Sequence, residues 1–206
     1  MNIVISGTVG VGKSTISKIL KQQLLKRKKN VSLIEEIQND NPYIDKYYNN
    51  RPEWSFLIQM DFVFDRFSKA YLNCKKGDFL NIFDRHFLDD YIFSNLPMIK
   101  DDMSNLLWNS YAIFNKELAL ILNETCRVDF FFLLKADFDK ILERISSRGI
   151  ESEKKVDIDY WKSLYHQYYE NNEIRKYIKN NVNKLIIIDA NTNDVKKIVE
   201  EIIKYL

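Results

Sequence analysis

Residues 7–14 read Gly7-Thr8-Val9-Gly10-Val11-Gly12-Lys13-Ser14, which fits the pattern GxxxxGK(S/T) without a mismatch. A β-branched run at residues 2–6 precedes this stretch, and a segment with apolar residues at helical spacing follows it. A glycine-rich turn between a strand and a helix points backbone N–H groups at phosphate oxygens, and the helix adds its positive end. The stretch therefore predicts a P-loop that binds a nucleoside triphosphate.

Two side chains of the predicted loop have distinct chemical roles. We expect Lys13 to reach the β- and γ-phosphates and the Ser14 hydroxyl to bind Mg²⁺. Because kinases, motors and switches share this loop, the motif alone predicts only a nucleoside triphosphate ligand. The expected donor contacts in this region are Gly7, Thr8, Val9, Gly10, Val11, Gly12, Lys13, Ser14 and Thr15.

Short β-branched or aromatic runs recur along the chain, at residues 2–6, 30–34, 78–83, 127–134 and 184–188. Longer stretches with apolar residues at helical spacing separate them, which indicates a parallel sheet covered on both faces. No internal repeat, low-complexity tract or Pro/Gly/Ser-rich linker divides the sequence. We therefore predict an α/β fold of the P-loop NTPase type, with a five-stranded parallel sheet and helices on both faces. One domain would span residues 1–206, with a short lid near residues 144–157.

The composition excludes several classes of function. The 31 basic residues nearly cancel the 29 acidic residues, so the formal charge of +2 provides no broad field that would attract nucleic acid or an anionic membrane. No segment approaches the roughly 20 consecutive apolar residues of a membrane-spanning helix, and the amino terminus lacks the basic region of a secretory signal. Cys74 and Cys126 have no CxxC spacing, which favours two buried free thiols in a cytoplasmic protein over a disulfide or a zinc site.

Charged pairs follow the second and third predicted strands, at the sheet edge where ligands bind in open α/β folds. Of Glu35 and Glu36, we expect Glu35 to accept the proton of an attacking hydroxyl and to align that hydroxyl with the γ-phosphate. We expect Asp84 to hold Mg²⁺ and Arg85 to neutralise charge on the transferring phosphoryl group. The alternative interpretations are a solvated glutamate pair and a helix cap with a surface cation.

The helical segment after residues 51–54 carries polar residues on an otherwise aromatic face. Gln59 and Arg66 are seven residues apart, which places them on one side of a helix, two turns from each other. Gln59 offers a donor and an acceptor to a base edge, and Arg66 offers a fixed fork of donors. We expect Asp90 to pair with Arg66 and to leave oxygen lone pairs for an exocyclic amine. A polar seam on an ordinary amphipathic helix is the alternative.

Taken in order, these motifs resemble the deoxyribonucleoside kinase family along nearly the whole chain, from Gly7 to the strand, loop and helix around Asp189. The resemblance rests on GTVGVGKS, IEE, Tyr48 followed by RPEWSFLIQ, Arg66, FDR with Asp90 beyond it, and RISSRG. Within the family, the sequence is most similar to the kinases of deoxyadenosine, deoxyguanosine and deoxycytidine. The resemblance implies ATP as the phosphate donor, Mg²⁺ as the cofactor and a homodimer.

The resemblance also implies roles for the charged pairs at the strand ends. Glu35 stands where the family keeps its catalytic carboxylate, and Glu36 replaces the proline that usually follows it. Arg85 stands for the arginine of the family's Glu-Arg-Ser, with Asp84 and His86 in place of its neighbours. Asp84 retains a carboxylate, and we interpret His86 as a local packing residue.

The acceptor-binding residues implied by the resemblance are Tyr48 and Glu153 for the sugar 3′-hydroxyl, and Gln59, Arg66 and Asp90 for the base. Glu35 and Arg85 would contact the acceptor at its reacting hydroxyl. Asp89 is the alternative to Asp90 if the correspondence shifts by one residue.

For the donor, Arg144 and Arg148 lie four residues apart on one helix face, as expected if both clamp the phosphates. Ile150 stands where the family often has a further arginine, so either Lys154 or Lys155 compensates or the lid carries less charge. The loop that resembles the family's contact with the donor adenine contains Asp189, Ala190 and Asn191.

We therefore predict an ATP-dependent kinase that phosphorylates the 5′-hydroxyl of a deoxynucleoside, preferably deoxyadenosine, with deoxyguanosine and deoxycytidine as weaker substrates. A nucleoside monophosphate kinase of the thymidylate kinase type is the first alternative, but Ile34 stands where such an enzyme commonly has an arginine for the acceptor phosphate. A P-loop switch or assembly ATPase is the second alternative. It leaves Gln59, Arg66, Asp90 and Tyr48 unexplained.

Overall fold

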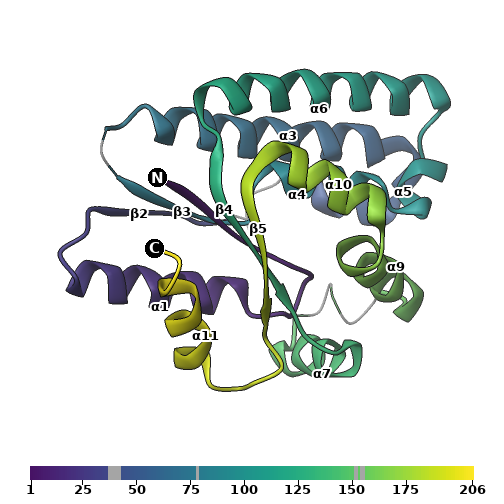
Figure 1. Cartoon of the computed structure of the whole chain (residues 1–206). Helices are drawn as coiled ribbons and strands as arrows, with labels where there is room; N and C mark the ends of the chain where they lie inside the picture. Colours follow the sequence, from purple (N-terminus) through teal and green to yellow (C-terminus); the bar gives the residue numbers. More distant parts are fainter. Residues whose placement is uncertain (37–42, 78, 151–152, 154–155) are drawn as a thin grey trace.

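A parallel sheet forms the centre of the computed structural model, which describes residues 1–36, 43–77, 79–150, 153 and 156–206 (Figure 1). The strands are β1 (Asn2–Ser6), β2 (Val31–Ile34), β3 (Leu80–Asp84), β4 (Val128–Lys135) and β5 (Val182–Asp189). They lie in the order β2-β3-β1-β4-β5, and each neighbouring pair is parallel. Every predicted strand is confirmed, with ends shifted by one or two residues; residue 78 lies outside the described part of the chain.

The carboxyl ends of all five strands gather at one edge of the sheet, because the strands run in the same direction. In the register of the sheet, Ile5 of β1 pairs with Asp84 of β3, and Ile34 of β2 pairs with Phe83. The P-loop that follows Ser6 therefore lies beside the residues that follow β2 and β3. This register brings together segments that are about 30 and 80 residues apart in the sequence.

Helices cover both faces of the sheet, which confirms the predicted fold class. In Figure 1 one face carries α3 (Arg51–Cys74), α4 (Phe87–Ser94), α6 (Asn105–Thr125) and α10 (Asn172–Asn181), and the other carries α1 (Lys13–Lys26) and α11 (Val195–Ile203). The remaining helices are α2 (Ile44–Asn49), α5 (Pro97–Asp101), α7 (Phe138–Arg148) and α9 (Ile158–Tyr169). Of the helices described, none is long and apolar enough to cross a membrane.

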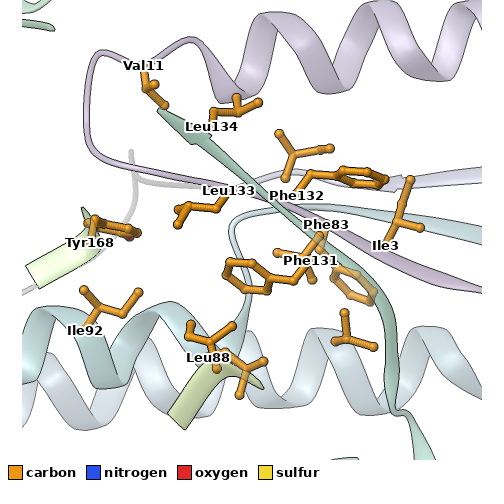
Figure 2. Close-up of a cluster of buried hydrophobic side chains, with 14 of the residues drawn as sticks. Ile3, Val11, Phe83, Leu88, Ile92, Phe131, Phe132, Leu133, Leu134 and Tyr168 are labelled. Carbon is orange, nitrogen blue, oxygen red and sulfur yellow. The ribbon is translucent and has the colours of Figure 1, made fainter. Parts of the chain in front are cut away.

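The core around β4 explains why this strand is apolar without interruption. Phe131 and Phe132 are both fully buried, although successive side chains of a strand point to opposite faces. Figure 2 shows Phe131 on the side of Leu88 and Ile92 from α4, and Phe132 on the other side of the sheet. A strand buried on both faces needs apolar residues at every position. This packing fixes the carboxyl end of β4 beside the P-loop.

Helix α7 packs directly on the P-loop. Gly10 has φ 81°, and a Cβ atom at this position would lie 2.7 Å from Ile145 Cγ1 and 3.0 Å from the carbonyl oxygen of Ile141. Both the left-handed backbone and the close approach of α7 therefore require glycine here. The contact holds Arg144 and Arg148, which belong to the same helix, over the mouth of the loop.

The prediction of two free thiols is wrong, because Cys74 and Cys126 form a disulfide. Cys74 is the last residue of α3 and Cys126 follows α6, and their Cα atoms are 5.7 Å apart. The two helices end side by side, so residues 52 positions apart in the sequence meet. The CxxC pattern identifies only cysteines that are close in the sequence. It cannot predict a disulfide between the ends of two helices, which depends on how those helices pack.

Candidate active site

The Lys13 side chain is folded onto the P-loop. Its Nζ donates hydrogen bonds to the carbonyl oxygens of Gly7, at 3.0 Å, and Thr8, at 2.9 Å. Burial, aided by the nearby charge of Arg85, lowers the pKa of the Lys13 ammonium to about 7. An anion at this position would restore the charged form. The lysine is thus placed to respond to a phosphate group.

A cleft of ≈ 720 Å³ opens above the loop, within the range of roughly 300–1,000 Å³ typical of small-molecule sites. Its walls come from the P-loop, the ends of β2 and β3, α7 and the loop before α11. The polar and loop residues that line it include Gly10, Gly12, Lys13, Ser14, Thr15, Glu35, Glu36, Arg85, Arg144, Ser147, Arg148, Glu153, Thr192 and Asn193. Of the predicted P-loop contacts, Gly7 and Thr8 are buried beneath the cleft and the rest face it.

Asp84 and Ser14 lie together at the start of α1. Burial raises the pKa of the Asp84 carboxyl, and a hydrogen bond from Ser14 works against that rise. Among the described residues, Asp84 Oδ1 is buried without a hydrogen-bond partner. The described part of the chain contains no group of three or more acidic, histidine or cysteine residues able to hold a metal. A metal at this position would therefore take few ligands from the protein.

Glu36 lies between two buried arginines. Its Oε1 atom is 2.8 Å from Arg85 Nε and 2.7 Å from Arg66 Nη2. Burial alone would raise the pKa of the Glu36 carboxyl, but Arg85 and Arg66 hold it well below its usual range. Glu36 is therefore an ionised carboxylate that faces the cleft beside the P-loop.

The structure gives Glu35 different surroundings from those of Glu36. Glu35 Oε1 lies 3.3 Å from Lys18 Nζ on α1, and about half of the Glu35 side chain is exposed. Both glutamates follow the last residue of β2, so the backbone beyond the strand sets their directions. Both glutamates line the cleft, but only Glu36 of the two has described arginine contacts, which makes it a stronger candidate than the predicted Glu35.

The predicted pairing of Arg66 with Asp90 is present. Arg66 Nη1 donates to Asp90 Oδ1, and the Asp90 side chain is 1% exposed. Burial raises the pKa of the Asp90 carboxyl to about 7, against the pull of Arg66. Gln59 is also buried, and in the described structure neither Gln59 Oε1 nor Asp90 Oδ2 has a hydrogen-bond partner. Asp90 thus has an open acceptor atom beside the Arg66 guanidinium, and Gln59, on the same helix as Arg66, has another.

Asp89 has a different role from Asp90. It accepts hydrogen bonds from the Ser6 hydroxyl, from the backbone N–H of His86 at 2.9 Å and from the Tyr168 hydroxyl at 2.7 Å. His86 is the N-cap of α4, and burial lowers the pKa of its imidazole to about 4. Asp89 and His86 together form a capping box, which fits the interpretation of His86 as a local structural residue.

Arg144 fastens the loop before α11 rather than standing free in the cleft. Its guanidinium donates to the carbonyl oxygens of Ala190, at 3.0 Å, and Thr192, at 3.2 Å. Ala190 is fully buried, and the cleft is lined by Thr192 and Asn193 instead of the predicted Asp189, Ala190 and Asn191. The described cleft is thus lined two to three residues later in this loop than the sequence predicts, and the contact with the donor adenine stays a prediction.

The predicted lid contributes one described ion pair to the cleft. Arg148 Nη1 lies 3.3 Å from Glu153 Oε1. Burial raises the pKa of the Glu153 carboxyl, with Arg148 acting against the rise, and in the residues we describe Glu153 Oε2 has no partner. Lys154, Lys155 and the side chain of Tyr48 lie outside the described part of the structure, so their roles stay predictions.

Sequence reasoning missed two adjacent tyrosines at the end of α9. The Tyr168 hydroxyl accepts a hydrogen bond from Arg85 Nη1 at 2.7 Å. The Tyr169 hydroxyl donates to the carbonyl oxygen of Leu134 at 2.7 Å and accepts from the Thr8 N–H at 3.3 Å. Buried tyrosines on an amphipathic helix have the same pattern as core residues, so no sequence signal separates these two.

A model of the deoxynucleoside kinase family matches residues 3–205. The chain belongs to the deoxynucleoside kinase family. Its family resemblance and its P-loop fold, both predicted from the sequence, are confirmed, and the enzyme is an ATP-dependent kinase of deoxynucleosides. This result decides against the thymidylate kinase and switch ATPase alternatives.

Relatives of this deoxynucleoside kinase are found among both sequences and structures. A Bacillus subtilis deoxyadenosine/deoxycytidine kinase is 33% identical over 171 residues, which cover 82% of this chain and 75% of the relative. A B. subtilis deoxyguanosine kinase is 31% identical over 166 residues, or 81% and 75% of the two chains. The structure of a deoxyadenosine kinase from M. mycoides with bound dATP is 28% identical, with a TM-score of 0.81 over 100% of this chain and 98% of that one.

The lowered pKa of Lys13 predicts that ATP binding takes up a proton. At pH 8 the unliganded lysine, with a pKa of about 7, is mostly neutral, and the phosphates restore its charge. Calorimetry in buffers of different ionisation enthalpy measures the uptake. The control is Lys13→Arg, whose guanidinium stays charged. The uptake of wild type should exceed that of the variant by up to about one proton at pH 8 and by much less at pH 6. Equal uptake at pH 8 would contradict the shift.

Proposed function

We propose that the protein transfers the γ-phosphate of ATP to the 5′-hydroxyl of a deoxynucleoside, with deoxyadenosine as its preferred acceptor. The observation that carries the proposal is the position of Glu36. This carboxylate faces the same cleft as Lys13 of the P-loop and is tied through Arg66 to the buried Asp90. A carboxylate that could align a hydroxyl is thus connected to a group that could recognise a base.

Glu36 would orient the attacking hydroxyl by accepting its hydrogen bond. Because two arginines hold its pKa low, Glu36 is a weak base, and its contribution is mainly alignment, with the proton leaving late. Phosphoryl transfer suits this role, since its transition state is loose and depends chiefly on positioning and charge stabilisation. Lys13, Arg85 and Arg148 line the cleft and would stabilise charge on the phosphates.

The residues present fit Mg²⁺. Mg²⁺ in such sites takes one or two protein oxygens and completes its shell with water and substrate phosphates. The Ser14 hydroxyl and the unpartnered Oδ1 of Asp84 provide two such oxygens at the start of α1. When bound, the ion would neutralise charge on the phosphates.

The open acceptor atoms of Asp90 and Gln59 favour a base with an exocyclic amino group. Asp90 Oδ2 and Gln59 Oε1 are acceptors that, within the described structure, have no partner. The amino group of adenine or cytosine is a donor, whereas thymine has a carbonyl there and adds a methyl group. Relatives named for deoxyadenosine, deoxycytidine and deoxyguanosine support an acceptor of this class. Tyr48 and Glu153 stay the proposed contacts of the sugar.

An apolar stripe on α3 and α6 supports a homodimer. Leu57 and Phe64 on α3 are exposed, as are Leu106, Ile113 and Leu120 on α6. The spacing of seven residues places each set along one side of its helix. In Figure 1 the two helices run side by side along one face of the molecule. A second copy would cover both stripes by packing helix against helix. We place this reaction in the cytoplasm, where nucleotides are salvaged, although the disulfide between Cys74 and Cys126 gives that placement no support.

The matched pair Glu36→Gln and Glu35→Gln tests which glutamate acts in catalysis. Glu36→Gln should lower kcat roughly 10²-fold, because the amide keeps the shape but lacks the charge that aligns the hydroxyl. Glu35→Gln removes an exposed pair with Lys18 and should change kcat by less than about threefold. Steady-state assays and melting temperatures are measured together. A defect confined to Glu35→Gln would contradict the assignment.

The proposed acceptor is tested with purified protein, ATP and Mg²⁺, and each deoxynucleoside in turn. Deoxyadenosine should give the highest kcat/KM, deoxyguanosine and deoxycytidine lower values, and thymidine a very low one. Deoxynucleoside monophosphates are the control and should not be phosphorylated. Turnover of monophosphates without turnover of deoxynucleosides would overturn the proposed function.

The same assay tests the base-reading pair through Arg66→Met combined with Asp90→Ala. The double change should shift preference toward thymidine, since it removes both the charges and the crowding at the thymine methyl. Each single change should damage the enzyme more, because a buried charge left without its partner costs roughly 3–5 kcal/mol. An unchanged ranking of substrates in the double variant would show that this pair does not read the base.

The homodimer is tested by sedimentation of wild type and Ile113→Glu. A charge at the centre of the apolar stripe should convert the dimer into a monomer, because an unpaired buried charge opposes association. Leu25→Glu, at an exposed position on α1, is the control and should remain dimeric. A monomeric wild type, or equal loss of the dimer in the control, would contradict the proposed interface.

A further inference from the structure

The backbone of Arg85 is held in a conformation that its own residue type disfavours. Its φ is 67°, in the left-handed region that glycine adopts readily and arginine rarely does. Its N–H donates to the carbonyl oxygen of Ile5 at 3.1 Å. Such strained residues persist where the surrounding structure fixes them, and they concentrate at functional sites. The contacts that fix the Arg85 side chain therefore bear on function.

Three groups hold the Arg85 guanidinium. Glu36 pairs with Nε, the ring of Phe93 lies under the guanidinium with its centroid 4.7 Å away, and the Tyr168 hydroxyl accepts from Nη1 at 2.7 Å. Glu36 and Phe93 come from segments close to Arg85 at the ends of β2 and β3. Tyr168 comes from α9, more than 80 residues later in the sequence. The hydrogen bond to Tyr168 therefore connects Arg85 to α9, the helix that follows the predicted lid.

The Tyr168 hydroxyl has a fixed direction. It donates to Asp89 Oδ1 at 2.7 Å, and Asp89 is itself held by the Ser6 hydroxyl and the N–H of His86. Burial raises the pKa of Tyr168 well above its usual value, so the hydroxyl keeps its proton for Asp89. Its lone pair then faces Arg85. The order of hydrogen bonds from Arg85 to Tyr168 to Asp89 is thus determined.

We propose that Tyr168 is a positioning residue that aims the Arg85 guanidinium at the transferring phosphate. The proposal rests on the proposed role of Arg85 in phosphoryl transfer. Figure 2 shows Tyr168 beside Leu133 and Ile92, so its ring is anchored in the core while its hydroxyl reaches the arginine. Misplacement by a fraction of an ångström reduces electrostatic stabilisation of a transition state more than it reduces substrate binding. The hydroxyl should therefore contribute to kcat and not to KM.

Tyr168→Phe removes the hydroxyl and keeps the ring. We expect kcat to fall about 10- to 100-fold, as for a hydrogen bond to a charged group, with KM for ATP and for deoxyadenosine within about twofold. Tyr165→Phe is the matched control on the same helix; its ring contacts with Phe138 and Tyr169 remain, and kcat should not change. A kcat of Tyr168→Phe within twofold of wild type would overturn the proposal.

A double-mutant cycle with Arg85→Lys separates positioning from general stability. Lysine keeps the charge but lacks the fork that reaches both Glu36 and Tyr168. If Tyr168 acts through Arg85, then Tyr168→Phe should lower kcat little further in the Arg85→Lys background. Effects that multiply would show a structural role and overturn the proposal. A full kcat in Arg85→Lys alone would overturn both the proposed role of Arg85 and this inference.

A second variant protects the test against a folding defect in Tyr168→Phe. Asp89→Asn keeps the size of the side chain but weakens the acceptor that orients the Tyr168 hydroxyl. It should lower kcat in the same direction, again with KM preserved and little added effect on Arg85→Lys. Melting temperatures of all variants are compared with wild type. If neither Tyr168→Phe nor Asp89→Asn lowers kcat in folded protein, the proposal is wrong.

Discussion

The Glu36 carboxylate between the guanidinium groups of Arg66 and Arg85 is the interaction on which the rest of the site depends. Arg66 comes from α3 and Arg85 from the end of β3, and both are buried within reach of the same oxygen. Two buried cations so close would repel each other without a shared anion, and each loses hydration by being buried. Glu36 therefore holds together the two faces of the acceptor site, and the charge that stabilises the structure is the charge proposed to align the hydroxyl.

The donor side is held by packing instead of by buried charge. Gly10 lets α7 approach the P-loop to van der Waals contact, and Arg144 then fastens the loop before α11 through its carbonyl oxygens. The phosphates need backbone N–H groups, which a close-packed glycine turn provides, and cations, which Lys13 and Arg148 bring to the cleft. The acceptor, in contrast, must be distinguished from similar nucleosides. Buried polar groups such as Asp90 and Gln59 do this strongly, because a base that leaves them without a hydrogen bond binds poorly.

Local patterns were sufficient to predict the sheet and the P-loop, whereas the pairing of Arg66 with Asp90 was inferred from the complementary charges of two residues expected at one site. A glycine-rich loop and a β-branched run each describe a structure within a few residues, and the register of a parallel sheet then places the loop ends together. The choice between Glu35 and Glu36 could not be made this way, because adjacent side chains beyond a strand end point where the loop backbone directs them. The sequence contains both carboxylates but no information on which one meets the arginines.

Contacts between distant helices were also beyond the sequence patterns. The disulfide joins the ends of α3 and α6, and the Tyr168 contact joins α9 to the residue after β3. Each depends on how two elements pack after the fold has formed, and a cysteine or a tyrosine on a helix has the same local pattern whether or not it meets a partner. Such contacts become visible only when the tertiary arrangement is known.

Arg66 connects the proposed recognition of the base with the proposed transfer of the phosphoryl group. Its Nη1 atom meets Asp90, and its Nη2 atom meets Glu36, so one rigid planar group contacts both carboxylates. The guanidinium cannot turn toward a misplaced base without changing its contact with Glu36, the carboxylate proposed to align the hydroxyl. A deoxynucleoside whose base fits poorly at Asp90 would therefore have its 5′-hydroxyl misaligned as well. A poorly fitting base would then lower the rate of transfer as well as the affinity. Binding energy from the base would thus contribute to stabilising the transition state.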